Sequence, residues 1–223
     1  MTMKSDNPLA EADSTLIFAV ALVVEGSLFV VAMILGALFD APPLATWAGA
    51  DGPSAAWGVA ASLPPALAIM WALHQRASFA WRLLEQAGES VGALLRLAPW
   101  QLAIVAMLAG LTEEALFRGV LQIAATDTLA TWLDGGMAQI YGVGVGALLF
   151  GLAHPISRAY VVFAVLFGSW MGVLLLLVGN LLAPIVAHAA YDFILLLYIR
   201  WAWQDRPGAH NAESPVAATD ELE

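Results

Sequence analysis

Three short groups of polar residues lie within otherwise apolar sequence. In the first, residues 111–119 read Leu-Thr-Glu-Glu-Ala-Leu-Phe-Arg-Gly. Glu114 and Arg118 are four residues apart, so on a helix they share one face in the order that favours an ion pair. Glu113 is rotated by about 100° from Glu114 and can face a different cavity. A buried carboxylate that lacks a cationic partner is suited to act as a general base.

The other two groups each contain a histidine. Phe150 and His154 are four residues apart, and Pro155 follows and is expected to end or kink the helix there. His188 and Asp192 are also four residues apart, so the carboxylate can hold the imidazole or both can face one ligand. Imidazole and carboxylate groups together serve in general acid–base catalysis and in metal binding.

The rest of the chain indicates that these groups lie inside a membrane. The 223 residues are 61% hydrophobic and 12% charged, whereas soluble domains carry about 25% charged residues. The apolar runs are long and continuous rather than alternating, which favours helices over a barrel. The predicted fold class is therefore all-α, a polytopic transmembrane helical bundle.

We predict about six spans and one amphipathic interfacial helix. The spans are residues 14–39, 55–74, 99 to about 125, 138–154, 160–178 and 181–203, and the amphipathic segment is 76–96. Prolines and glycines predict a loop at 40–54, and Asp127 to Gly136 resembles a loop or short surface helix. Pro64 and Pro65 are expected to kink the second span. The predicted divisions are an acidic tail (1–13), N-terminal spans with the interfacial helix (14–98), a catalytic core (99–203) and a second acidic tail (204–223).

Basic residues predict the orientation of the spans. Arg76, Arg82 and Arg96 cluster in one connection, while the connections 40–54 and 126–137 contain no Lys or Arg. By the positive-inside rule, the connection with the three arginines is cytoplasmic, the connections 40–54 and 126–137 lie outside, and both chain ends are cytoplasmic. We expect a multi-pass protein of the bacterial inner membrane.

Charge and cysteine content exclude several classes of function. The net charge is −10 and there is no basic stripe, which argues against a nucleic-acid partner. The chain has no cysteine, so disulfides, thiolate metal sites and cysteine nucleophiles are excluded. Charged groups inside a span are costly and are functional by default. Glu25 stands alone in the first span, and we expect it to contact another helix or a water-filled face rather than to act in catalysis.

Taken in order, the three motifs resemble those of the CAAX-protease and bacteriocin-processing (CPBP, Abi) family of intramembrane endopeptidases. Glu-Glu-x-x-x-Arg is followed by Phe-x-x-x-His and then His-x-x-x-Asp, each in an apolar helix. The resemblance covers residues 113–192. It implies that Glu113 activates a water molecule, that His154 shares this water, and that His188 with Asp192 forms the oxyanion site. It assigns Glu114 and Arg118 to a supporting ion pair, and we expect Phe150 to serve in packing.

Two questions remain open within this resemblance. The prenyl-endopeptidase branch usually has asparagine where this chain has Asp192, and an ionised aspartate cannot donate to an oxyanion. Asp192 is therefore either protonated or an acceptor that orients His188. The family has also been interpreted as metal-dependent. We expect no cofactor, and zinc held by ligands from Glu113, Glu114, His154 and His188 is the alternative.

The predicted function is hydrolysis of a peptide bond in a membrane-associated protein or peptide. The alternatives are a non-catalytic membrane scaffold or immunity protein on the same fold and a proton-coupled transporter, since buried Glu, His and Asp also build proton relays. The span limits place His154 near one membrane surface and His188 nearer the other. A shared site therefore requires tilted or broken helices.

Overall fold

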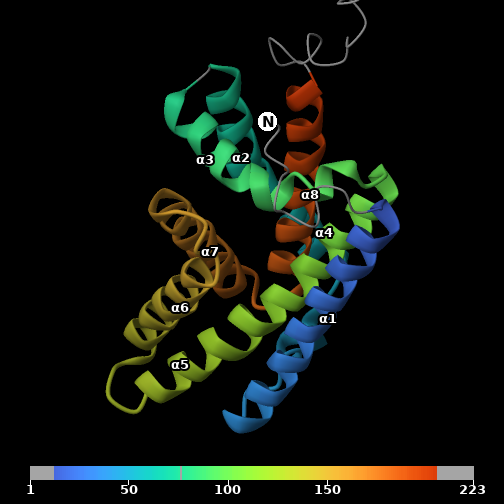
Figure 1. The fold of residues 1–223 in the computed structure, drawn as a ribbon. Coiled ribbons are helices and arrows are strands. Elements are labelled where there is room, and N and C mark those ends of the chain that lie inside the picture. The colour runs from blue at the N-terminus through green and yellow to red at the C-terminus, as the bar shows by residue number, and fades with distance from the viewer. Residues whose placement is uncertain (1–12, 76, 205–223) are drawn as a thin grey trace, which may run out of the picture.

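The computed structural model describes residues 13–75 and 77–204, and Figure 1 shows their arrangement. The predicted acidic tails fall almost entirely outside the described residues, as does Arg76. Helices make up nearly all of the described chain. In order they are α1 (Ser14–Leu38), η1 (Ala45–Gly49), α2 (Gly52–His74), α3 (Ser78–Val91), η2 (Leu94–Arg96), α4 (Pro99–Glu114), η3 (Ala115–Gln122), α5 (Ile123–Leu129), α6 (Gly135–Leu152), α7 (Arg158–Val178) and α8 (Leu182–Gln204).

Five of the described helices are long and apolar enough to cross a bilayer: α1, α2, α6, α7 and α8. Large apolar side chains on their outer faces are exposed, among them Val23 at 70%, Trp71 at 67% and Leu177 at 78%. Such surfaces are compatible with lipid and not with water. The helical bundle predicted from the sequence is thus confirmed, and the chain is a multi-pass integral membrane protein. Its orientation and the host membrane stay predictions.

The remaining predicted span corresponds to three consecutive elements. Helix α4 continues into η3, which has π-helical geometry, and then into α5 without a break. Residues 99–129 advance by about 46 Å at ~1.5 Å per residue, which exceeds a hydrocarbon core of about 30 Å. The helix extends further than the sequence indicated, because the polar residues after Ala125 continue it for another turn. A count of six spans stays a prediction.

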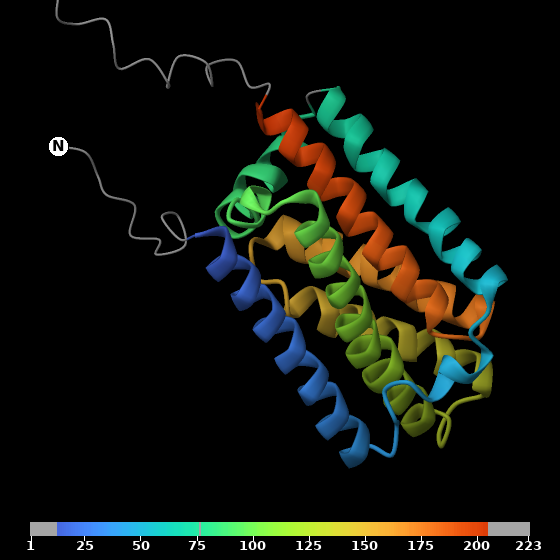
Figure 2. The ribbon, with the colours of Figure 1, turned by 90° about the vertical axis from the view of Figure 1, so that its right-hand side faces the viewer.

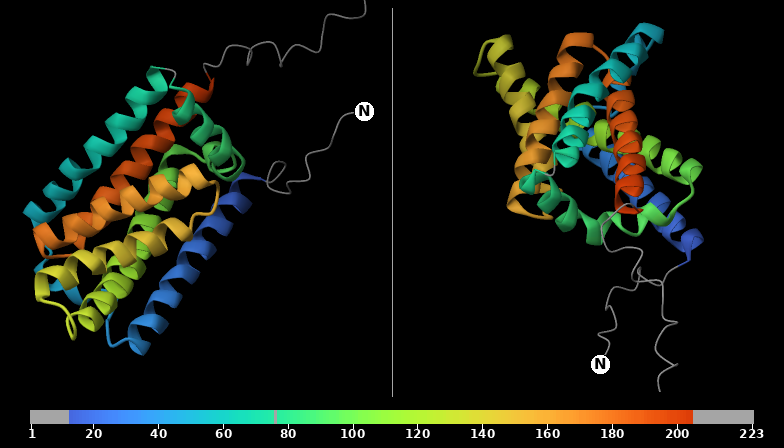
Figure 3. Two further views of the ribbon diagram at one scale, coloured as in Figure 1. Left: turned by 90° about the vertical axis from the view of Figure 1, so that its left-hand side faces the viewer. Right: turned by 90° about the horizontal axis from the view of Figure 1, so that it is seen from above.

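The helices form one bundle in which α1 runs parallel to α4 and α2 runs parallel to α8, while α4 and α8 run antiparallel (Figure 2). Helix α8 packs against both α2 and α4, α1 packs against α4 and η3, and α6 pairs with α7. Figures 2 and 3 show the start of α1 and the end of α8 at the same end of the bundle, which also holds α3. The α6–α7 pair crosses the other helices obliquely (Figure 1). This arrangement brings α4, η3, α6 and α8 together around one region.

The expected interfacial helix is present as α3. Ala80 and Leu84 are buried, while Arg82 and Glu85 on the other face are exposed, as amphipathic helices require. The predicted loop before α2 is shorter than expected. Asp51 caps α2 by accepting a hydrogen bond of 2.8 Å from the Ser54 amide, which helps to hold the pKa of Asp51 below its usual value.

Pro64 and Pro65 lie inside α2, which runs as one helix from Gly52 to His74. The structure therefore does not divide the second span at this pair. Neighbouring helices compensate for the lost hydrogen bonds in membrane proteins. One such contact is present nearby, where the Trp170 indole nitrogen of α7 donates to the Ala61 carbonyl oxygen at 2.9 Å.

Close contact between α4 and α8 depends on Gly110. A Cβ atom at this position would lie 2.8 Å from the Ile185 carbonyl oxygen and 2.9 Å from the Ala189 nitrogen. Both are backbone atoms, so only a shift of one helix would relieve the overlap. Gly110 therefore lets the carboxylates at the end of α4 reach α8.

Replacing Gly110 by alanine is expected to destabilise the folded protein by about 1–3 kcal/mol, because overpacking separates the two helices. The measurement is thermal unfolding of the purified protein in detergent. Gly144→Ala is the control, since a Cβ there would have no atom within 4 Å, and its helix propensity predicts equal or higher stability. An unchanged unfolding temperature in Gly110→Ala would show that α4 and α8 are not held this closely.

Candidate active site

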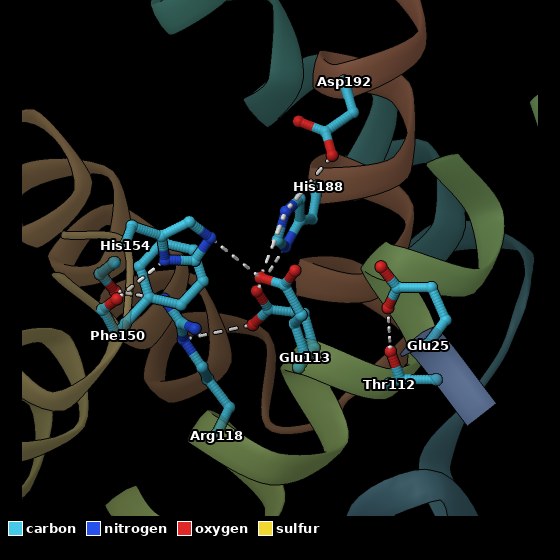
Figure 4. Close-up of polar contacts among 10 residues, drawn as sticks. Glu25, Thr112, Glu113, Arg118, Phe150, His154, His188 and Asp192 are labelled. Carbon is cyan, nitrogen blue, oxygen red and sulfur yellow. Dashed lines mark hydrogen bonds and ion pairs between the residues drawn. The ribbon is translucent and has the colours of Figure 1, made fainter. Parts of the chain in front are cut away.

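A buried chain of charged groups links α4, η3 and α8. Arg118 Nε lies 3.1 Å from Glu114 Oε2, and both side chains are 0% exposed. The other carboxylate oxygen, Glu114 Oε1, lies 2.8 Å from His188 Nδ1. Glu114 therefore bridges the arginine of its own helical segment and the histidine of α8. Figure 4 shows Arg118, His154 and His188 converging on the region of Glu113.

Arg118 is fixed by two further contacts. Its Nη2 donates a hydrogen bond of 2.9 Å to the Gly168 carbonyl oxygen of α7. Its guanidinium carbon lies 4.7 Å from the centre of the Phe150 ring, within the range of a cation–π interaction. Phe150 is 3% exposed and contacts the rings of both His154 and His188. The packing role expected for Phe150 thus includes holding the arginine and the two imidazoles.

The contact with Glu114 determines how His188 presents its ring. Nδ1 faces a carboxylate, which can only accept, so Nδ1 carries a proton and donates a hydrogen bond to Glu114. The opposite nitrogen, Nε2, lies 4.0 Å from Glu113 Oε2 and 3.5 Å from Asp192 Oδ2. A doubly protonated ring satisfies Glu114 and also presents an N–H to the remaining two carboxylates.

Glu113 points to a different side of the helix from Glu114. Its Oε2 lies 3.8 Å from His154 Nε2, and its side chain is 14% exposed. Glu113 Oε2 is itself buried and has no hydrogen-bond partner within the described part of the chain. The carboxylate therefore has a free acceptor atom between the two histidines.

His154 lies just after α6, because this helix ends at Leu152, two residues before the predicted end of the fourth span. The end of α6 orients the imidazole ring of His154. Its Nδ1 lies 2.8 Å from the Phe150 carbonyl oxygen, so Nδ1 donates to that acceptor and the neutral ring leaves Nε2 as a free acceptor facing Glu113. The side chain is 27% exposed. Neutral Nε2 can accept a proton or a hydrogen bond from a molecule beside Glu113.

The long α4–η3–α5 helix explains why residues expected near opposite membrane surfaces meet. From Glu113 to Leu129 this helix advances about 24 Å, and α6 returns about 26 Å from Gly135 to Leu152. His154 therefore arrives back at the level of Glu113. His188 lies about 9 Å from the start of α8, and the packing of α8 against α4 places it beside Glu113 and Glu114.

Asp192 lies next to His188, on the side of Nε2. Its Oδ2 lies 3.5 Å from Nε2, while Nδ1 of the same ring contacts Glu114. Sequence reasoning did not find the link between Glu114 and His188. Their separation of 74 residues leaves no local pattern that could show it.

These groups face a cavity of about 270 Å³. One end is lined by Glu113, His154, His188 and Asp192, and Glu25 of α1 lies at the same cavity. The other end is apolar. Its lining includes Ile69, Leu73, Leu83, Leu84, Leu195 and Ile199.

The polar side chains of the site include residue types that bind metal ions. Among residues 13–75 and 77–204, no group of three or more His, Asp or Glu side chains is arranged to hold a metal ion. Of the four alternative zinc ligands, Glu114 already engages His188 and Arg118 with its two oxygens. The arrangement of these donors does not fit a preformed zinc site.

Comparison with known proteins gives one match. Residues 95–194 match the family model described as type II CAAX prenyl endopeptidase Rce1-like. The matched segment covers less than half of the chain, but it contains all three motifs and excludes α1, α2 and α3. No curated protein and no solved structure matches the chain.

Proposed function

Because residues 95–194 match the family model described as type II CAAX prenyl endopeptidase Rce1-like, we propose that the chain is an intramembrane endopeptidase that hydrolyses its substrate with a water molecule activated by Glu113 and His154. One observation carries this proposal. The buried Glu113 Oε2 has no hydrogen-bond partner in the described chain, lies 3.8 Å from His154 Nε2 and borders the cavity.

In the first step, Glu113 acts as general base. A water molecule in contact with Glu113 Oε2 and His154 Nε2 gives a proton to the carboxylate while its oxygen attacks the peptide carbonyl carbon. Burial of the site suits this step, because a carboxylate away from bulk water is a stronger base. No residue of this chain forms a covalent intermediate in this scheme.

In the second step, the tetrahedral intermediate is stabilised and then collapses into products. His188 Nε2–H donates to the oxyanion, and Glu114 on Nδ1 favours the protonated ring that this donation needs. Glu113 then returns its proton to the leaving nitrogen as the C–N bond breaks. The products are a carboxyl group and an amine. Asp192 acts as an acceptor beside Nε2 in the resting state.

The substrate is a membrane-associated protein or peptide. The apolar end of the cavity is bordered by α2, α3 and α8, so it accommodates an apolar segment or anchor while the polar end receives the peptide bond. The chemistry of the lining is equally compatible with a prenyl group and with apolar side chains.

The test uses the purified full-length protein in liposomes with a library of lipid-anchored peptides, analysed by mass spectrometry with and without a chelator. The expected result is cleavage at defined bonds that is unchanged by the chelator. Loss with the chelator and rescue by zinc would replace the metal-free mechanism by a metalloprotease. No cleavage by wild type would refute the endopeptidase proposal in favour of a scaffold or transporter, and equal cleavage by wild type and Glu113→Gln would refute the role of Glu113 as the base.

A further inference from the structure

Glu25 is a carboxylate near the middle of the most lipid-exposed span. It lies in α1 (Ser14–Leu38), whose most apolar window is only 11% buried in the bundle. A charged group at such a depth costs about 3 kcal/mol or more on insertion scales. Such a residue is retained where it meets a polar partner or ligand.

One of its oxygens has a clear structural partner. Thr112 Oγ1 of α4 donates a hydrogen bond of 2.7 Å to Glu25 Oε2. Figure 4 shows that the second carboxylate oxygen points away from Thr112. A neutral glutamine side chain would accept the same hydrogen bond, so the contact with Thr112 does not explain why the residue is an acid.

The cavity that Glu25 borders is rich in acceptors. Three carboxylates line it, from Glu25, Glu113 and Asp192, and the described residues of its lining include no lysine or arginine. The protonated His188 ring offsets one of these three negative charges. Arg118 lies behind the site and is engaged with Glu114. Charges interact strongly in a cavity with apolar walls, so this cavity favours a positive group.

A second, independent group in the lining also lacks a partner. Tyr191 is 4% exposed, and its hydroxyl has no hydrogen-bond partner among the described residues. It lines the same cavity. Buried hydroxyls are normally hydrogen-bonded, so the cavity is suited to a polar ligand.

We propose that Glu25 determines specificity by binding a lysine or arginine side chain of the substrate near the cleaved bond. This inference rests on the proposed endopeptidase function and adds a preference for positive charge to it. Thr112 holds one oxygen of Glu25 and thereby directs the other to the cavity. Glu113 and Asp192 add to the negative potential, while the two histidines belong to the hydrolytic step.

The experiment compares matched peptides in liposomes. Each pair of lipid-anchored peptides carries lysine or norleucine at one position around the cleaved bond, so only the ammonium group differs. For wild type, kcat/KM is expected to favour lysine about tenfold or more at one position, the effect of one hydrogen bond to a charged group. Glu25→Gln is expected to reduce this ratio to about one. For Glu25→Lys, a second peptide pair carries glutamate or glutamine at that position, and kcat/KM is expected to favour glutamate.

The control is Glu85→Gln on the exposed face of α3, which is expected to keep the wild-type ratio. A merely structural role of Glu25 would change the unfolding temperature and leave the ratio as in wild type, and this result would overturn the inference. So would a wild-type ratio near one at every position. If wild type cleaves none of the peptides, the endopeptidase proposal fails and the inference fails with it.

Discussion

Replacing Glu113 by glutamine is expected to lower kcat by about a thousandfold, because an amide cannot take the proton of the attacking water. Glutamine keeps the size of the side chain, so the fold and the cavity are retained and KM is expected to change little. The measurement is steady-state cleavage of a lipid-anchored peptide in liposomes, with thermal unfolding as the check on folding.

Glu85→Gln is the matched control, since Glu85 lies on exposed α3 outside the cavity lining. His154→Gln is expected to reduce kcat by about a hundredfold, which is less than Glu113→Gln, because His154 assists the base and does not replace it. A kcat for Glu113→Gln within a few-fold of wild type would eliminate Glu113 as the base and leave the endopeptidase function to be explained by other residues.

The largest effect on stability is expected from Arg118→Met. The substitution leaves the carboxylate of Glu114 in a fully buried position without its cation. Breaking a buried ion pair by removing one partner costs about 3–5 kcal/mol. The loss of the hydrogen bond to Gly168 adds to this effect. The measurement is the free energy of unfolding in mixed detergent micelles.

Two further variants separate charge from packing. Arg82→Met removes an arginine from the exposed face of α3 and is expected to change stability by less than about 0.5 kcal/mol. Glu114→Gln combined with Arg118→Met removes both charges, so it is expected to recover part of the lost stability. It is not expected to recover activity, because His188 loses its carboxylate partner. Equal stability of Arg118→Met and wild type would contradict the buried ion pair.

Much of the architecture could be predicted from the sequence. Long apolar runs are sufficient to indicate membrane helices, because lipid cannot satisfy open backbone groups. Helical periodicity placed Glu114 beside Arg118 and turned Glu113 away from both, as in the structure. The limits of the third helix were predicted less well. Polar residues after Ala125 resembled a loop, whereas packing against α6 keeps them helical to Leu129.

The contacts between helices could not be predicted in the same way. Glu114 meets His188 across 74 residues, and Glu25 meets Thr112 across 87. Spacing along one helix says nothing about which face of a distant helix lies opposite. His188 illustrates this limit, because its spacing indicated Asp192 as a neighbour but gave no sign of Glu114, which lies 2.8 Å from Nδ1.

The sequence by itself thus determined that the chain lies in lipid, that its spans are helices, and which residues make up the three motifs. Hydrophobicity and helical periodicity are properties of each segment alone. Only the tertiary structure decided that the three motifs lie at the same level across the bundle and can form one site. That depends on the length of the α4–η3–α5 helix, on the return of α6 along it, and on Gly110, which allows α4 to approach α8. The tertiary structure also placed Glu25 at the cavity, because the packing of α1 against α4 determines which side of an isolated apolar span faces inward.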